Sequence, residues 1–540
     1  MHKNDPIGWG RRMLAAAGWV APLLYAVLAL SKLRYPGVHF DEMLHVNAAL
    51  GGLDDTFMNR SITVPIFGQV PLLLMPYIGA LKAWITAPIF ALFGVSVLTL
   101  RLPMIVLTAF ALRILQGTLR RPIGDAAASI VVLILAVDPT LLSLTRADSG
   151  PVALQFFLTV LAIWAFEHYR RGQRYWYLLV LLASLGFGVF NKLNYIWIVN
   201  AFVLAAVLVY GKITYQALRA KYNGVRAKIL WVHVGTWLVG LGATAGYYAL
   251  LSYKFNLGGF LDPDRLQPLV RLQNVGSSIY GLLTGDLFYN YGLGVLKMPG
   301  AAVIAVGLTA LVVAGFVFYV FAKKIAATDK KVFVFFVVLF GATLAQIFVT
   351  RNAVWPWHYA TLYPAVTILI VMALKVCAQK LSKAIWLVIP VLLVFYLVTY
   401  GAYLRHYGEP TKNVYWSPAI YELIEATQDD TYRYVSIDWG THTQLLGFSQ
   451  DPVKFQNASF FINRDPLPTD ARELFNQRYL SGGAKPIRFI LHAPEHTLFP
   501  AARKNFFSLV GGPQAVQLVK TISNGAQPGE GSLFEFYQLR

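Results

Sequence analysis

"VPLLLMPYIGALKAWITAPIFALFG", residues 70–94, is apolar and long enough to cross a membrane, but its composition argues against a spanning helix. A bilayer crossing takes about 20 residues. Pro71, Pro76 and Pro88 interrupt helical hydrogen bonding. Lys82 would also bring a charge into lipid, which is costly. We therefore predict interfacial or re-entrant helices at the membrane surface, the alternative being a span whose lysine extends to the interface.

The composition of the whole chain indicates a membrane protein. Of its 540 residues, 57% are hydrophobic and 13% are charged, whereas soluble domains carry about 25% charged residues. The net charge of +20 is typical of basic cytoplasmic loops in such a protein, rather than of nucleic-acid binding. Because Cys377 is the single cysteine, an intramolecular disulfide and a metal site built on several thiolates are excluded.

Eleven other apolar runs predict about eleven transmembrane helices. With a cytoplasmic N-terminus, every basic loop between them falls in the cytoplasm, as the positive-inside rule requires, provided that residues 70–94 do not span. The first run is long enough to span and lacks a cleavage site, so we expect an uncleaved anchor. The runs lie near residues 13–33, 98–118, 125–145, 150–168, 175–191, 194–211, 230–252, 299–322, 332–350, 358–375 and 384–404.

The sequence after the last run changes in character and predicts a second domain. "YRYVSID" (432–438) and "IRFILHA" (487–493) are typical of strands. "WSPAIYELIEAT", with Ser417 as a cap, and "TDARELFNQRYLSGG" are typical of helices. We predict a transmembrane domain over residues 1–404 and an extracytoplasmic α/β domain over residues 405–540.

Ionisable residues gather at the predicted outer ends of the spans, where they are functional candidates by default. The carboxylates Asp41 and Asp148 suit proton abstraction or the binding of a hydroxyl group. The cations suit a phosphate or pyrophosphate. The pattern predicts displacement at a carbon that carries a phosphate leaving group, on a lipid-phosphate substrate. The candidate cations are Lys82, Arg146, Lys192, Arg351 and His358, the last followed by Tyr359.

Each of these residues also has a structural interpretation. Asp41 and Asp148 are good helix caps, and Glu42 would favour the helix dipole from the first turn. Arg146 could pair with Asp148, while Lys192 and Arg351 could anchor the chain at the membrane interface. The joint pattern at one face of the membrane favours the functional interpretation.

Three segments resemble a known family when they are taken together. They are "HFDEMLH" in the first outer loop, "IFALFGVSVLTLRLP" after it, and "SLTRADSGPVALQFFLTVLAIWA" after the third span. In order and spacing they resemble the dolichyl-phosphate-mannose protein mannosyltransferases and the aminoarabinose lipid A transferases, over roughly residues 15–210. "HYATLYP" in a late loop resembles a further family region. The resemblance implies the all-α GT-C fold, with interfacial helices in the first outer loop.

The resemblance also implies roles for the site residues. Asp41 would act as or near the general base, Glu42 would support the acceptor site, and Asp148 would be the second carboxylate, with Arg146 beside it. In the aminoarabinose branch a lysine within "K-P-P" contacts the carrier phosphate, whereas Lys82 here lies in "GALKAWITAP". The mannosyltransferase branch carries a lumenal insertion that this chain lacks, so protein O-mannosylation is not favoured.

We therefore expect a multi-pass, inverting glycosyltransferase of the bacterial inner membrane. Its donor would be a sugar on polyprenyl phosphate, such as undecaprenyl phosphate, and its acceptor a glycan, lipid or protein. No cofactor is required because side chains supply the cations, although a carboxylate-bound divalent ion stays an alternative. The main rival is a transporter or flippase with the carboxylates as a proton relay, which the lack of matching halves disfavours. A non-catalytic scaffold would leave the outer charges unexplained.

Overall fold

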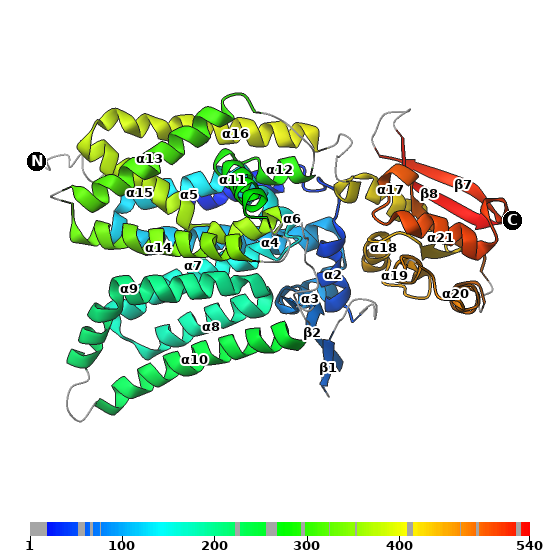
Figure 1. Ribbon diagram of the computed structural model, residues 1–540, viewed down its shortest axis with the longest axis horizontal. Coiled ribbons are helices and arrows are strands. Elements are labelled where there is room, and N and C mark those ends of the chain that lie inside the picture. Colours follow the sequence, from blue (N-terminus) through cyan, green and yellow to red (C-terminus); the bar gives the residue numbers. More distant parts are fainter. Residues whose placement is uncertain are drawn as a thin grey trace, which may run out of the picture.

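A helical bundle and a C-terminal domain with a β-sheet make up the molecule (Figure 1). The domain lies next to one end of the bundle, which we call the domain end. The computed structural model describes residues 19–51, 60–64, 68–75, 77–221, 227–254, 267–292, 298–322, 325–350, 354–407, 414–464, 466–481, 485–524 and 531–540.

Within these residues, six helices are long and apolar enough to cross a membrane. Two of them are preceded by a 3-10 turn, η1 (Leu193–Tyr195) before α9 and η6 (Lys383–Leu387) before α16. The six are α4 (Val97–Ile123), α7 (Val152–Gly172), α9 (Ile196–Lys221), α13 (Ala301–Phe321), α14 (Ala327–Val349) and α16 (Val388–His406).

Two bent helix pairs raise the count to eight when each pair is taken as one span. Eight of the eleven predicted runs thus correspond to candidate spans, and the other three coincide with helices whose described apolar segments are shorter. The bent pairs are α5 (Asp125–Val137) with α6 (Pro139–Ala147) and η5 (Pro356–Leu362) with α15 (Ala365–Lys380). The shorter segments are Trp19–Leu30, Tyr175–Asn191 (α8) and Val234–Gly246 within α10 (Ala227–Lys254).

Apolar side chains cover the outside of the bundle as well as its core. Val207, Val303 and Val391 are each more than half exposed, as side chains that face lipid would be. Two further helices, α11 (Pro268–Thr284) and α12 (Leu287–Gly292), lie between α10 and α13 in the sequence. The predicted mostly helical membrane fold is confirmed.

Among its described residues, the segment at 70–94 contains no helix long enough to span, and it is not wholly helical either. Its second half is α3 (Leu81–Phe93), with 13 residues. Its first half lies in a three-stranded antiparallel sheet of β1 (Arg60–Val64), β2 (Gly68–Met75) and β3 (Ile78–Gly79). The prediction of helices was wrong for this half, because Pro71 bars helical continuation and the apolar residues after it pair as a strand.

The C-terminal domain is built on a five-stranded mixed sheet in the order β5-β4-β6-β8-β7. The first three strands are parallel, whereas β8 pairs antiparallel with both β6 and β7. The two strands predicted from sequence are β4 and β6. The strands are β4 (Arg433–Ser436), β5 (Phe455–Asn457), β6 (Ile487–His492), β7 (Val516–Ser523) and β8 (Ser532–Leu539).

Successive residues of these strands face opposite sides of the sheet and fill two cores. Val435 and Phe489 pack on one face, together with Phe506 from α21. Tyr434 and Ile490 pack on the other. The helices are α17 (Ala419–Ala426), α18 (Thr441–Ser449), α19 (Ser459–Ile462), α20 (Ala471–Phe475) with the π-turn η8 (Asn476–Leu480), and α21 (Pro500–Val510).

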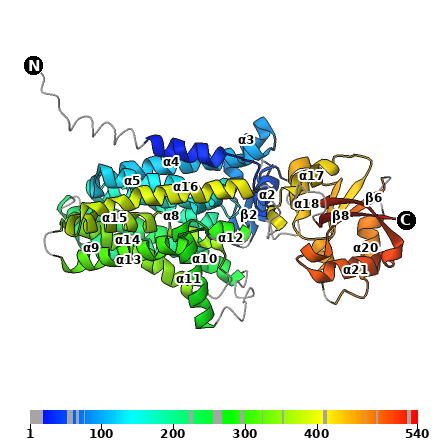
Figure 2. The same cartoon turned by 90° about the horizontal axis from the view of Figure 1, so that it is seen from above.

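Helix α2 (Phe40–Ala49) lies between the bundle and the C-terminal domain, as the view turned by 90° also shows (Figure 2). It packs against α18 on the domain side and against α3 on the bundle side. This helix carries the acidic pair of "HFDEMLH", so the fold brings that motif to the domain end.

Candidate active site

Helix α2 holds Asp41 in its first turn without using it as a cap. The cap is His39, whose Nδ1 accepts from the Asp41 backbone N–H at 3.2 Å. The Glu42 carboxylate closes the capping box by accepting from the His39 N–H at 3.0 Å. The capping interpretation is therefore wrong for Asp41 and applies to Glu42. The Asp41 side chain is 17% exposed and lies 3.8 Å from His39 Nδ1.

Glu42 is committed to a buried ion pair. It is fully buried, and its two oxygens accept from Nε and Nη2 of Arg101 at 2.9 and 2.8 Å. Arg101, near the start of α4, also donates to the carbonyls of Leu33 and Pro36 at 2.7 and 3.1 Å. These bonds join the start of α2 to the bundle, which leaves Asp41 as the carboxylate of the pair that is accessible to a substrate.

Lys82 and Asp148 form a second buried ion pair at the domain end. Lys82, in the first turn of α3, lies 2.8 Å from Asp148 Oδ2 and donates to the Asp148 carbonyl at 2.8 Å. Asp148 Oδ1 accepts from the Ala153 N–H in the first turn of α7 at 2.7 Å, although the N-cap position of that helix is Pro151 and not Asp148 as the structural interpretation expected. Both side chains are at most 2% exposed. Asp148 thus fixes the position of Lys82.

Lys192 makes fewer polar contacts with the described residues than Lys82 or Arg146 does. It lies between α8 and η1, and a backbone bridge to Ile78 ties it to the small sheet. Its ammonium is 3.4 Å from the Gly150 carbonyl and 6.0 Å from the Trp357 ring centre. No ion pair within 4.0 Å involves it among the described residues, so its charge is available for an anionic ligand.

The charges of this group act on one another. Burial raises the pKa of Asp41 to about 7, against the opposing effect of Lys192 and Lys82. Burial lowers the pKa of Lys192 to about 8, although Asp41 and Asp148 oppose that change. The pKa of Asp148 is also raised by burial, against the charge of Lys82. A carboxylate that titrates near neutral pH beside a cation suits general base catalysis.

His45 and Tyr77 join this group, although the sequence did not single them out for chemistry. His45 follows Asp41 by one helical turn, a spacing that places both on one face of α2. Burial, together with the charges of Lys82 and Lys192, lowers the pKa of His45 well below its usual value, so its ring is neutral. Its Nδ1 is buried without a hydrogen-bond partner among the described residues. The charge of Asp41 also acts on the Tyr77 hydroxyl. The i, i+4 spacing was the available signal for His45.

Arg146 has a different set of partners from the one expected. Its guanidinium donates to the Tyr400 hydroxyl at 2.8 Å and to the carbonyls of Lys32 and Tyr35 at 2.7 and 2.6 Å. It is fully buried. These contacts join α6 to α16 and to the chain before α2. Arg146 therefore holds the backbone near the site.

The late loop, in which the Trp357 ring lies beneath the Lys192 ammonium, contains two further candidates. His358, in η5, accepts from the Trp355 N–H at 3.0 Å, and its ring packs edge-on to Trp197. Tyr359 lines a small cavity that also contains Arg271. Arg351 lies outside the described residues. No cluster of three or more metal-ligating side chains occurs in the part of the chain that the structure describes.

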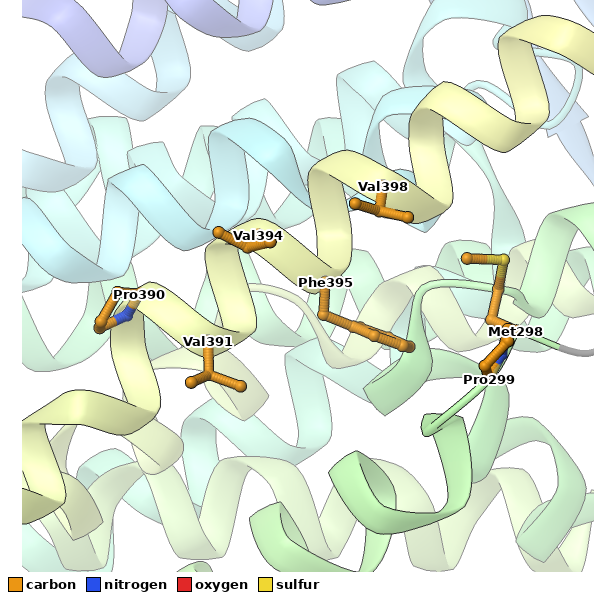
Figure 3. Close-up of a pocket in the computed structure, with 7 residues that line it drawn as sticks. All are labelled: Met298, Pro299, Pro390, Val391, Val394, Phe395 and Val398. Carbon is orange, nitrogen blue, oxygen red and sulfur yellow. The ribbon is translucent and has the colours of Figure 1, made fainter.

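A larger cavity of about 570 Å³ lies on the flank of the bundle and contains none of these residues (Figure 3). Its described lining is wholly apolar, from α16 and from Met298 and Pro299. It carries no group that could act on a phosphate or a hydroxyl.

Comparisons with known proteins agree with this architecture. Residues 79–239 match the family model described as dolichyl-phosphate-mannose-protein mannosyltransferase. No curated protein sequence matches the chain significantly. The chain superimposes on the crystal structure of ArnT from Cupriavidus metallidurans in the apo state with a TM-score of 0.51 and 13% identity, over 97% of this chain and 98% of that one.

The same ArnT bound to undecaprenyl phosphate gives a TM-score of 0.51 and 14% identity, over 98% of each chain. An oligosaccharyltransferase from Archaeoglobus fulgidus gives 0.48 and 12%, over 92% of this chain and 71% of that one. The ArnT likeness establishes the GT-C fold, and the family match confirms the resemblance found in the sequence.

Proposed function

We propose that this GT-C protein is a membrane glycosyltransferase that moves a sugar from a polyprenyl-phosphate donor to an acceptor hydroxyl group. The observation that carries the proposal is that Asp41, a partly exposed carboxylate, interacts electrostatically with Lys192 at one end of the bundle. Lys192 has no ion-pair partner within 4.0 Å among the described residues. ArnT, which shares the fold, has been crystallised with undecaprenyl phosphate, and this supports a carrier of that class.

The proposed reaction inverts the configuration at the anomeric carbon. The acceptor oxygen attacks that carbon from the face opposite the phosphate, and the bond between carbon and phosphate oxygen breaks. The bonding electrons leave with the phosphate. Asp41 takes the acceptor proton, for which a pKa of about 7 is well matched to neutral conditions. Lys192 stabilises the charge that grows on the departing phosphate.

The remaining residues have supporting roles in this proposal. Asp148 holds Lys82 in place, and the two add a positive hydrogen-bond donor near Asp41. His45, neutral and unpaired at Nδ1 among the described residues, can bond a sugar hydroxyl. Glu42 and Arg146 act on the shape of the site through Arg101 and the chain before α2. His358, Tyr359 and Arg351 stay proposals for the carrier region.

We further propose that the protein lies in a bacterial inner membrane with the domain end outside the cytoplasm. This orientation agrees with the distribution of basic residues along the chain. A carrier lipid would then keep its tail in the bilayer while its phosphate reaches Lys192.

Transfer can be tested with the purified protein in phospholipid vesicles. The vesicles are supplied in turn with undecaprenyl phosphate carrying radiolabelled glucose, mannose, galactose or aminoarabinose, and with an envelope extract of bacteria that lack the protein. Mass spectrometry of lipids that co-purify with the protein guides the choice of sugar. We expect label to move from at least one donor to the extract with release of undecaprenyl phosphate. No transfer from any donor, and no polyprenyl lipid in the preparation, would contradict the proposal.

A further inference from the structure

The C-terminal domain holds α2 by hydrogen bonds near both of its ends. Before the helix, Gln444 Nε2 donates to the Val38 carbonyl at 2.5 Å. Near its end, Asn47 Nδ2 donates to the Thr443 carbonyl at 3.1 Å. Gln444 and Asn47 are 5% and 6% exposed, so neither bond competes with bulk water.

Aromatic contacts add to this attachment at the start of the helix. The His39 ring stacks on Trp416, with ring centres 4.3 Å apart, and Phe40 packs edge-on to Trp439 at 3.8 Å. The Gly37 N–H donates to the Trp416 carbonyl at 2.8 Å. A Cβ at Gly37 would lie 2.0 Å from the Ser417 carbonyl oxygen, so the close approach of the two backbones requires glycine.

The part of the domain that makes these contacts is the carboxyl edge of its parallel strands. Helix α18, which carries Gln444, follows β4 directly. Strand β5 pairs with one edge of β4 and strand β6 with the other edge, so the strand order reverses at β4. In open α/β sheets the carboxyl ends of the strands, where the strand order reverses, are the usual place for a ligand. In this protein α2 packs there.

Asp41 is the second residue of the helix that the domain holds. On the bundle side, the Glu42–Arg101 pair fixes α2 through the residue next to Asp41. On the domain side, Val38 and Asn47 lie three residues before and six residues after Asp41. The direction of the Asp41 carboxylate therefore depends on both halves of the molecule.

We propose that the C-terminal domain positions the catalytic helix α2, with Gln444 as a positioning residue for the Asp41 base. The inference rests on the proposed function, because Asp41 matters to turnover only if it takes the acceptor proton. The domain thereby acts on the chemical step, while the cations that face the donor phosphate belong to α3 and to the turn after α8.

The test compares Gln444→Ala with Gln477→Ala, a matched control. Gln477 lies in η8 and bonds to Glu473, at the surface of the same domain. Because small misplacements of a catalytic group cost up to 100-fold in rate, we expect Gln444→Ala to lower kcat by about tenfold. The KM for the undecaprenyl-phosphate sugar that the wild-type protein uses best should not change, since a group that acts only in the transition state affects kcat alone.

Hydrogen exchange in α2 supplies a second measurement that does not depend on turnover. Amides of α2 should exchange faster in Gln444→Ala and in Asn47→Ala than in the wild type or in Gln477→Ala. The melting temperature of the bundle should be the same in all four proteins. A normal kcat in Gln444→Ala, or a kcat loss matched by Gln477→Ala, would overturn the positioning role and leave the proposed function intact. Wild-type turnover by Asp41→Asn would overturn the assignment of Asp41 as the base and with it the positioning role, whereas only a failure of the wild-type protein to transfer sugar would overturn the proposed function.

Discussion

The buried pair of Glu42 and Arg101 gives a prediction whose size follows from the structure. In Arg101→Met, Glu42 keeps the His39 N–H as its hydrogen-bond donor and loses the cation on both of its oxygens. Glu42 is fully buried, and removing one partner of a buried ion pair costs about 3 to 5 kcal/mol. We expect a loss of that size in the free energy of unfolding.

Glu42→Gln should cost less, because an amide oxygen can still accept from His39 while Arg101 keeps its bonds to backbone carbonyls. The double variant should be less destabilised than the sum of the two, since it leaves no unpaired charge. Arg120→Met is the matched control. Arg120 lies on α4 like Arg101, and it pairs with Asp125 at the start of α5. These two side chains are 31% and 49% exposed, so the expected loss in the free energy of unfolding is about 0.5 kcal/mol.

The assay is denaturant unfolding in detergent micelles, followed by tryptophan fluorescence, together with turnover of the folded fraction. Glu42→Gln should lower kcat by about tenfold without abolishing turnover, because Glu42 positions α2 and does not touch the substrate. The reasoning fails if Arg101→Met is no less stable than Arg120→Met, or if Glu42→Gln abolishes turnover in protein that remains folded.

Two further predictions concern the charges around Asp41. The profile of kcat/KM against pH should be bell-shaped, rising near pH 7 as Asp41 loses its proton and falling near pH 8 as Lys192 loses its own. Initial rates across this range test it, and a flat profile would contradict it. Lys192→Met should lower kcat/KM for the donor by about tenfold or more, as loss of a charged hydrogen bond does. Because Lys192 lowers the pKa of Asp41, the acidic limb should also move to higher pH, and an unmoved limb would show that the two groups do not interact.

Much of the bundle could be predicted because long apolar runs have few possible structures in a membrane. Backbone groups in lipid must bond within their own segment, so each run predicts a helix. The sequence also predicts that residues 70–94 do not form a spanning helix, since three prolines and a lysine oppose a span. The secondary structure that those residues form instead could not be predicted, because a short apolar run is compatible with either a strand or a buried helix.

The candidate site was only partly predictable for a different reason. Composition and order along the chain predicted that Asp41, Lys82 and Lys192 lie at one face of the membrane, and in the structure both lysines are close enough to Asp41 to affect its pKa. The partners that decide a residue's role are distant in sequence. Glu42 bonds to Arg101, which is 59 positions away in the sequence, and Arg146 bonds to Tyr400, which is 254 positions away. No local sequence pattern distinguishes a buried arginine that donates to backbone carbonyls from an arginine that binds a phosphate.

The most direct test of the account is the single-turnover rate of Asp41→Asn with the preferred undecaprenyl-phosphate sugar at saturating acceptor extract. Asparagine has nearly the same size and cannot accept the proton, so the rate should fall by about 100-fold or more while undecaprenyl phosphate still binds with wild-type affinity. The rise of the wild-type rate near pH 7 should also disappear. A variant that transfers sugar at the wild-type rate, with the same pH profile, would contradict the assignment of Asp41 as the base.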